Sequence, residues 1–183
     1  MTKKIVMTLA GILAATGAFA ETSASGNQLF PVVDSSYQAN PVLSLVGGSM
    51  NPKEGDGGSV VGVELSLDCP LFQPSKGQVR QQVSYTTYDK NNVKITNIEL
   101  NPHWMTELSD GFFAGFGPGL GLVQTSVTGG NSNSYLALAV GGSASYRSGP
   151  IQAGLEYREQ FTQEVDRTNV NNNRILFKVG YVF

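Results

Sequence analysis

Apolar and polar residues alternate along most of the chain from residue 41 onward. In the final stretch the positions of one parity, here the odd-numbered ones, are aliphatic or aromatic: Ile175, Phe177, Val179, Tyr181 and Phe183. The even-numbered positions include two positive charges and a glycine: Arg174, Lys178 and Gly180. Successive side chains of a β-strand point to opposite faces, so a period of two indicates a strand with one apolar face. An aromatic residue at the end of such a strand favours a position at a membrane boundary.

Seven similar runs precede this one, separated by turn-rich breaks. The expected strands are 42–50, 59–67, 78–88, 93–105, 112–124, 135–146, 151–162 and 173–183. Most have about 9–12 residues, the length at which a tilted strand crosses a hydrocarbon core. The pattern predicts an all-β meander. Apolar residues change parity between Ile95 and Ile98, which predicts a bulge near Thr96 or Asn97, and Pro118 predicts a kink or bulge in the fifth run.

The first 40 residues lack this alternation. Residues 1–20 combine two lysines, an apolar segment and a small-x-small ending at Ala20, which predicts a cleaved secretory signal peptide. Residues 21–40 form a polar N-terminal lead, expected either to cover a barrel end or to be a loosely ordered arm. Residues 41–183 would then be the barrel. No later run reaches the roughly 18 apolar residues of a membrane-spanning helix, so a membrane role requires a barrel.

Charge and cysteine content exclude some classes of function. The net charge is -2 and its charges are interspersed, so no basic patch suggests nucleic-acid binding. Cys69 is the single cysteine and cannot form an intramolecular disulfide. We expect a lone thiol in a turn.

Two eight-stranded barrels fit the alternation, and residue identity favours one. A soluble ligand-binding barrel turns its apolar parity inward, whereas an outer-membrane barrel turns it outward. Glycine, alanine and serine fill the polar parity of the fifth and sixth runs, and such small residues fit a narrow interior. Charged residues on this parity balance in sign, which predicts a lumen network of Glu64, Arg80, Glu99, His103, Glu156, Arg158, Arg174 and Lys178.

Aromatic residues and connection lengths support the outer-membrane orientation. The apolar parity carries the aromatic residues expected of interfacial girdles: Tyr85, Trp104, Phe112, Tyr146, Tyr157, Tyr181 and Phe183. With the C-terminus on the periplasmic side, the turns 108–111 and 147–150 are short, while 68–77 is a long exception. The outer loops are then expected at 51–58, 89–92, 125–134 and 163–172.

The chain resembles the small outer-membrane β-barrel family that includes the OmpA transmembrane domain and the opacity-type proteins. The resemblance covers residues 41–183 and rests on the signal peptide, the eight runs and the ending Val179–Phe183. It implies an eight-stranded antiparallel up-and-down transmembrane β-barrel in the bacterial outer membrane, in contact with lipid and lipopolysaccharide. Tyr181 and Phe183 look like the signal that such proteins present to the barrel assembly machinery. A periplasmic peptidoglycan-binding domain is not expected.

Catalytic and metal-binding patterns are not expected. Small outer-membrane barrels include lipid A deacylases, but their motif would place a serine two residues after His103, where Met105 stands. A group acting on lipid should also face outward, and His103 has the inward parity. No zinc, calcium or phosphate-loop spacing occurs. We therefore expect no enzyme and no cofactor, but a structural or surface-interaction protein whose loops bind an extracellular partner. The alternatives are a narrow pore for small solutes and an exported soluble ligand-binding barrel.

Overall fold

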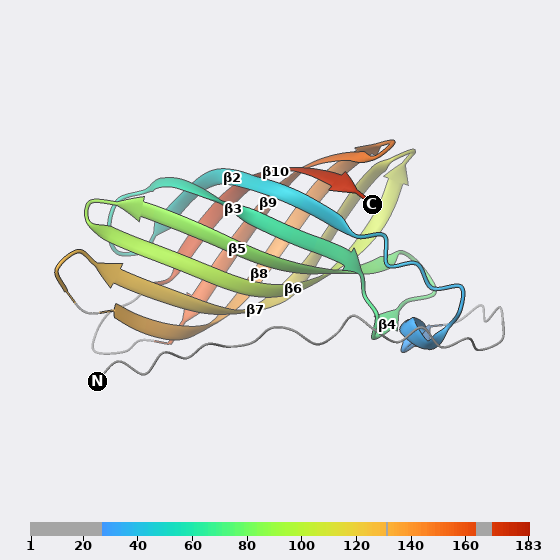
Figure 1. Cartoon of the computed structure of the whole chain (residues 1–183), viewed down its shortest axis with the longest axis horizontal. Helices are drawn as coiled ribbons and strands as arrows, with labels where there is room; N and C mark the ends of the chain where they lie inside the picture. Colours follow the sequence, from blue (N-terminus) through green and yellow to red (C-terminus); the bar gives the residue numbers. More distant parts are fainter. Residues whose placement is uncertain (1–26, 131, 164–169) are drawn as a thin grey trace.

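Eight long strands close into one antiparallel barrel in the computed structural model (Figure 1). The structure describes residues 27–130, 132–163 and 170–183, so the predicted signal peptide lies outside the described residues. The barrel strands are β2 (Val42–Pro52), β3 (Gly58–Asp68), β5 (Gln78–Lys90), β6 (Val93–Ser109), β7 (Phe112–Val127), β8 (Ser132–Ser148), β9 (Ile151–Thr162) and β10 (Asn172–Val182). Each strand pairs with its neighbours in sequence, and β10 pairs with β2. The predicted eight-stranded up-and-down barrel is confirmed.

The pairing of the first and last barrel strands removes both sheet edges. It runs without interruption from Val182 opposite Val42 to Asn172 opposite Pro52. A closed sheet leaves no exposed row of unpaired backbone groups, which is the condition for a β-structure to lie in lipid. Among the described residues, no helix has the length and apolar character needed to cross a membrane.

The two barrel ends differ in their connections. We call the end where Phe183 lies the C-terminal rim, and the other end the distal rim. The distal rim has connections at 53–57, 91–92, 128–131 and 163–171, and the C-terminal rim has them at 69–77, 110–111 and 149–150. Asn91 and Asn92 have φ values of 51° and 64°. Positive φ at both central residues matches the twist of a two-residue hairpin, which explains why β5 continues past its predicted end at residue 88 to Lys90, while β6 begins at Val93 as predicted.

The predicted bulge near Thr96 or Asn97 is wrong. β5 and β6 keep one register from Gln78 opposite Met105 to Lys90 opposite Val93. Ile95 instead points inward and is only 3% exposed. The change of parity therefore marks an apolar residue on the lumen side, without an inserted residue.

The predicted bulge at Pro118 is also wrong. The register of β6 and β7 is the same before and after this proline, with Leu100 opposite Leu120 and Trp104 opposite Phe116. This register places Pro118 opposite Pro102, and since neither proline has an N–H group, the ladder is interrupted without a shift. The pairing register of β6 and β7 shifts elsewhere, between Glu107 and Ser109.

The N-terminal lead packs against the C-terminal rim. Its strand β1 (Gln28–Leu29) pairs with β4 (Phe72–Gln73) in the long 69–77 connection, and the 3₁₀ helix η1 (Pro31–Val33) follows (Figure 1). We call residues 27–40 together with 69–77 the rim annex. The long connection on this side therefore has a structural reason, because it provides the partner strand for the lead.

Backbone and side-chain hydrogen bonds tie the rim annex to β3. The Asp68 N–H donates to the Ala39 carbonyl at 2.8 Å, and the Tyr37 hydroxyl donates to the Asp68 carbonyl. Burial raises the pKa of the Tyr37 hydroxyl, and the nearby Asp68 carboxylate acts in the same direction. Tyr37 therefore stays a protonated donor at neutral pH, and the described part of the lead is held against the rim.

Candidate functional site

The lumen is filled with side chains from all eight strands. The predicted network residues Glu64, Arg80, Glu99, His103, Glu156, Arg158 and Arg174 are all buried, and Lys178 is 12% exposed at its side chain. All eight point into the lumen. Arg158 and Arg174 are among the largest fully buried side chains of the protein.

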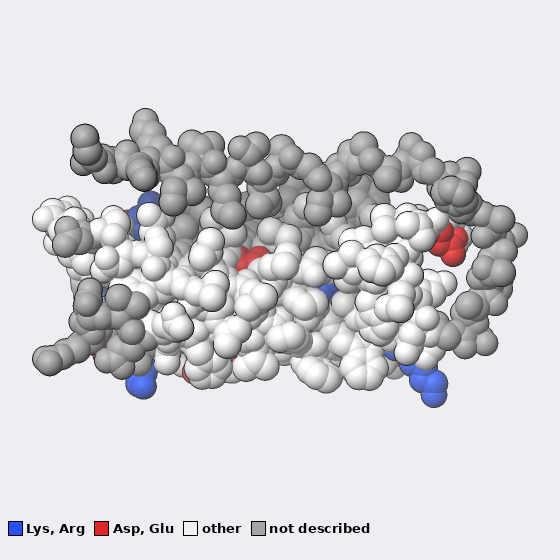
Figure 2. Space-filling view, turned by 90° about the horizontal axis from the view of Figure 1, so that it is seen from below, with Lys and Arg blue, Asp and Glu red and all other residues white. Residues whose placement is uncertain are grey.

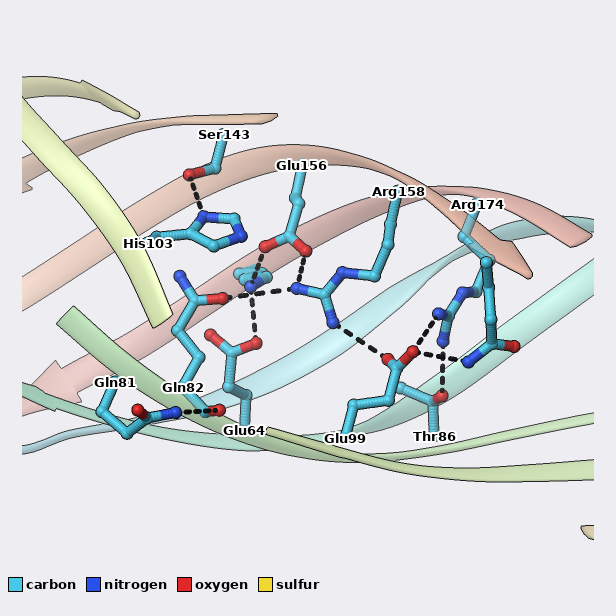
Figure 3. Close-up of polar contacts among 12 residues, drawn as sticks. Glu64, Gln81, Gln82, Thr86, Glu99, His103, Ser143, Glu156, Arg158 and Arg174 are labelled. Carbon is cyan, nitrogen blue, oxygen red and sulfur yellow. Dashed lines mark hydrogen bonds and ion pairs between the residues drawn. The ribbon is translucent and has the colours of Figure 1, made fainter. Parts of the chain in front are cut away.

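Six of these residues form a continuous chain of ion pairs across the lumen (Figure 3). The order is Arg174, Glu99, Arg158, Glu156, Lys178 and Glu64, so cations and anions alternate. Glu99 accepts from the Arg174 Nη2 at 2.6 Å and from the Arg158 Nη1 at 2.9 Å. Lys178 donates to Glu64 at 2.6 Å, and Glu156 pairs with both Lys178 and Arg158. With three cations and three carboxylates, the ion-pair chain is neutral.

Neutrality is needed because two of the cations are direct neighbours. Arg158 on β9 lies opposite Arg174 on β10. Two like charges side by side in the protein interior are destabilising, and an unpaired buried charge also lowers the stability of the fold. Glu99 reaches across from β6 and pairs with both guanidinium groups. This carboxylate therefore makes the neighbouring arginines compatible with burial.

Buried amide and hydroxyl groups complete the network. Gln160 donates to Glu99 at 2.6 Å and accepts from Asn172 at 2.7 Å. Arg158 donates to the Gln82 side chain at 3.3 Å, and Arg174 donates to the Thr86 hydroxyl at 3.4 Å. These residues were not in the predicted set. Their parity could have identified them, because Gln82 and Thr86 share the face of Arg80, and Gln160 shares the face of Arg158.

Arg80 belongs to a second, separate ion pair near the C-terminal rim. It donates to Asp68 at 2.9 Å, to the Asn40 carbonyl at 3.0 Å and to the Ser66 hydroxyl at 3.2 Å. The sequence predicts Asp68 in a turn, but the structure places it at the end of β3, where it follows Glu64 and Ser66 at the inward parity. Because Asn40 also donates to the Asp68 carboxylate at 2.7 Å, this pair links the rim annex to the lumen.

His103 lies beside the ion-pair chain and contacts a serine that the sequence did not reveal. Its Nδ1 lies 3.2 Å from the Ser143 Oγ, across from β6 to β8 (Figure 3). The imidazole is 0% exposed. Among the described hydrogen bonds no carboxylate orients this ring, and the contact is enclosed in the lumen, away from the lipid-facing surface. The described residues also contain no group of three or more His, Cys, Asp or Glu side chains that could hold a metal ion.

Apolar side chains fill the distal part of the lumen and reach the ion-pair chain, where Leu176 lies between Arg174 and Lys178 on β10. This apolar plug consists of Val46, Met50, Val60, Tyr88, Ile95, Val123, Tyr135, Ala137, Val170 and Leu176. Met50, Val60 and Val123 are 0% exposed. The polar parity was expected to line the whole lumen, and the distal part differs from this expectation.

Small cavities remain in the half of the lumen nearer the C-terminal rim. One of about 30 Å³ is lined by residues that include Glu64, Arg80 and Lys178. Another of about 70 Å³ lies at the rim between residues that include Asp68, Phe113 and Arg147. These volumes suit a few water molecules at most.

The outer surface of the barrel is apolar. Leu45, Phe116, Leu138 and Phe177 are outward-facing residues that are each at least 60% exposed. Figure 2 shows a side of the molecule where uncharged residues prevail and most visible charges lie near the two ends. This orientation is the reverse of that in a soluble ligand-binding barrel, which has its apolar side inside.

The aromatic residues of this surface gather mainly at one rim. The predicted girdle residues are all exposed, and the ones near the C-terminal rim are Trp104, Phe112, Tyr146, Tyr181 and Phe183. The rings of Trp104 and Phe116 are tilted with centroids 6.1 Å apart, and those of Tyr181 and Phe183 meet edge to face at 5.3 Å. Tyr85 and Tyr157 lie midway along their strands, and of the exposed aromatic residues that the structure describes only Phe161, near the end of β9, lies toward the distal rim.

Comparison with solved structures identifies the fold. No protein-family profile matches the chain, and no curated protein is significantly similar in sequence. The crystal structure of Neisserial surface protein A (NspA) matches with a TM-score of 0.60 and 18% identity, over 78% of this chain and 96% of that one. Ail, the attachment invasion locus protein of Yersinia pestis, matches with a TM-score of 0.55 and 12% identity, over 86% of this chain and 99% of that one. The chain therefore has the fold shared by these small eight-stranded outer-membrane β-barrels.

Proposed function

We propose that this chain is an outer-membrane barrel with a structural or surface-interaction role, a closed lumen and no catalytic activity. The observation that carries the proposal is the inverted distribution of side chains. Large apolar residues such as Leu45 and Phe116 are exposed, while Arg158, Arg174 and Glu99 are buried. In water, both the exposed apolar side chains and the buried charges would be unfavourable, whereas a barrel in lipid has its apolar surface outside.

The height of the apolar surface supports a membrane location. Outward residues of β8 are apolar or small from Leu136 to Tyr146, a distance of ten residue steps. At about 3.3 Å per step and a tilt of roughly 40°, this stretch spans about 25 Å along the barrel axis, the height of the apolar band in outer-membrane barrels. The C-terminal rim, with its aromatic residues, is then at the periplasmic interface.

Cell fractionation and gel migration test the membrane location. We expect the expressed protein in the outer-membrane fraction, and an unboiled sample that migrates differently from a boiled one. Cleavage after Ala20 predicts a mature chain that begins at Glu21, which intact-mass measurement checks. Recovery in the soluble periplasmic fraction with identical migration would favour an exported soluble barrel and refute the proposal.

The closed lumen distinguishes this proposal from a narrow pore. The ion-pair chain crosses the middle of the barrel, and the apolar plug fills the distal part. We expect no stepwise increases of ionic current across planar lipid bilayers at protein amounts at which a porin gives single-channel currents. Regular steps from protein that passes the gel-migration test would support the pore.

The absence of catalysis is proposed from the position of the Ser143–His103 contact. Both residues point into the lumen, and the imidazole is enclosed there. A serine nucleophile that acts on lipid needs access to the outer surface. We expect purified protein to release no acyl chains from lipopolysaccharide or phospholipid, and release that a His103→Gln variant abolishes would contradict the proposal.

Surface partners of this protein would bind at the distal rim. Its described charges are mixed, with Lys53, Lys90 and Lys94 against Glu54, Asp56 and Asp89. Ail of Yersinia pestis has been solved in complex with the heparin analogue sucrose octasulfate. Since the described distal rim of this chain has no excess of positive charge, we propose a partner other than a sulfated polyanion. Binding to immobilised heparin at physiological salt would contradict this.

Lipid, lipopolysaccharide and the barrel assembly machinery are the partners proposed for the rest of the surface. The exposed Tyr181 and Phe183 stand at the end of β10, where an assembly factor can reach them. We expect deletion of Phe183 to lower the amount of heat-modifiable protein in the outer membrane. An unchanged amount would remove this residue from the proposed signal.

A further inference from the structure

The rim annex exposes an unusual number of large apolar side chains. Its members Leu29, Phe30, Val32, Val33, Leu71 and Phe72 are 74%, 57%, 42%, 62%, 59% and 36% exposed. The two segments that carry them lie side by side, because Leu29 lies opposite Phe72 in the small sheet and the Phe30 N–H donates to the Leu71 carbonyl at 2.8 Å. Contiguous apolar surface of this kind usually marks a contact with another molecule or with a membrane.

The polar contacts of the annex are directed toward the barrel and leave its apolar residues outside. Tyr37 and Asn40 donate hydrogen bonds to Asp68 at the end of β3. The side-chain amide of Gln73 donates to the Val79 carbonyl and accepts from the Val79 N–H. Phe30 adopts a φ of 54°, which is uncommon for a bulky residue. The annex is therefore fastened by its polar groups in a conformation that keeps the apolar groups exposed.

The annex contacts the lipid-facing surface of the barrel at Trp104. The outward-facing Trp104 donates from its indole to the Lys76 carbonyl at 3.2 Å, and its neighbour across the strand pair is the exposed Phe116. Tryptophan at this place is typical of a membrane interface. In Figure 1 the annex lies just past the ends of β3 and β5. Its residues carry two charged side chains, Asp34 and Lys76.

We propose that the rim annex inserts its apolar side chains into the periplasmic leaflet of the outer membrane, where phospholipid acyl chains cover them. The occupant is lipid because the surface extends the lipid-facing belt at the level of Trp104. This inference rests on the proposed membrane orientation of the barrel. It gives the N-terminal lead a role as an interfacial anchor beside the transmembrane strands.

Fluorescence quenching in pure lipid tests the proposal. In a Cys69→Ala background, single cysteines at Val33, Ser35 and Phe116 are labelled with the fluorophore NBD, and each protein is folded into phosphatidylcholine vesicles with or without spin-labelled lipid. Phe116→Cys lies on the barrel belt and serves as the positive control. Ser35→Cys is exposed in the same segment as Val33→Cys, on a polar residue, and is the matched control.

Insertion predicts that the Val33 probe loses about half or more of its fluorescence to spin labels near the top of the acyl chains, because an interfacial apolar face lies about 5–10 Å deep. The Phe116 probe should be quenched as well, and the Ser35 probe should not. Quenching at Phe116 without quenching at Val33 would overturn the annex proposal and leave the barrel orientation intact, and a periplasmic protein would then be the remaining occupant.

Two further outcomes also decide against the proposal. Quenching at Ser35 equal to that at Val33 would mean that the probe drives insertion. No quenching even at Phe116 would overturn both the annex proposal and the membrane orientation. If Val33→Cys fails the heat-modifiability check, Leu71→Cys reports on the same surface from the 69–77 connection, with the same expected loss of fluorescence.

Discussion

Glu99→Gln removes the carboxylate that separates two neighbouring buried arginines. Arg174 has Glu99 as its ion-pair partner at 2.6 Å, and both side chains are at most 1% exposed. Glutamine keeps the shape and one acceptor oxygen, but it leaves the ion-pair chain with an excess positive charge. Breaking a buried pair by removing one partner costs about 3–5 kcal/mol, because the other charge stays buried without compensation.

Urea unfolding in lipid vesicles or detergent measures this cost, with Trp104 fluorescence and gel migration as two independent signals. A loss of about 3 kcal/mol corresponds to a lower urea midpoint by roughly 1–3 M if the slope is about 1–3 kcal/mol per molar urea. Glu54→Gln is the matched control. It removes the same charge from an exposed loop residue and should change stability by less than about 0.5 kcal/mol.

A double variant separates charge imbalance from loss of contacts. Glu99→Gln with Arg174→Met removes one anion and one cation, and it leaves the alternating and neutral series Arg158, Glu156, Lys178 and Glu64. We expect the double variant to be more stable than Glu99→Gln alone, since no uncompensated cation stays buried. A Glu99→Gln protein as stable as Glu54→Gln, or simply additive effects of the two lumen substitutions, would contradict a large cost of the unpaired Arg174 charge.

Three other measurements follow from the geometry. A Cβ on Gly48 would lie 1.9 Å from the Ile175 carbonyl oxygen, whereas one on Gly47 would meet nothing within 4 Å. Gly48→Ala should therefore lower the urea midpoint and Gly47→Ala should not, and equal midpoints for the two variants would contradict this. Leu176→Ala opens a cavity in the apolar plug and should cost about 2–5 kcal/mol in the same assay, and a cost below about 1 kcal/mol would mean that the plug collapses without loss. Cys69 is 6% exposed, so a water-soluble maleimide should label it slowly in folded protein and rapidly in urea, and equal rates would show that the thiol is accessible.

The strands were predictable because their signal is local. A period of two over about ten residues indicates a strand without knowledge of its neighbours, and all eight predicted runs correspond to strands. Their ends were less predictable. Asn91 and Asn92 alone form a turn that was expected to include Asp89 and Lys90, because positive φ at two residues lets β5 continue to Lys90.

The lumen was predictable as a set of residues and not as a set of pairs. Parity assigns Glu99, Arg158 and Arg174 to one face of their strands, but the pairing of Glu99 with both arginines joins residues 59 and 75 positions apart. Strand register and tilt decide which side chains meet across a barrel. For the same reason no local pattern indicates the contact of His103 with Ser143, because the two residues lie 40 positions apart on different strands.

The sequence by itself determined the number of strands, the two faces of each strand and the balance of charge on the inner face. These properties follow from alternation, composition and turn residues, which act within a few positions of the chain. Only the tertiary structure decided the alternating ion-pair chain, the apolar plug and the pairing of β1 with β4 in the rim annex. Each depends on closure of β10 against β2, or on contacts between segments far apart in sequence, and no local pattern specifies the register in which such segments meet.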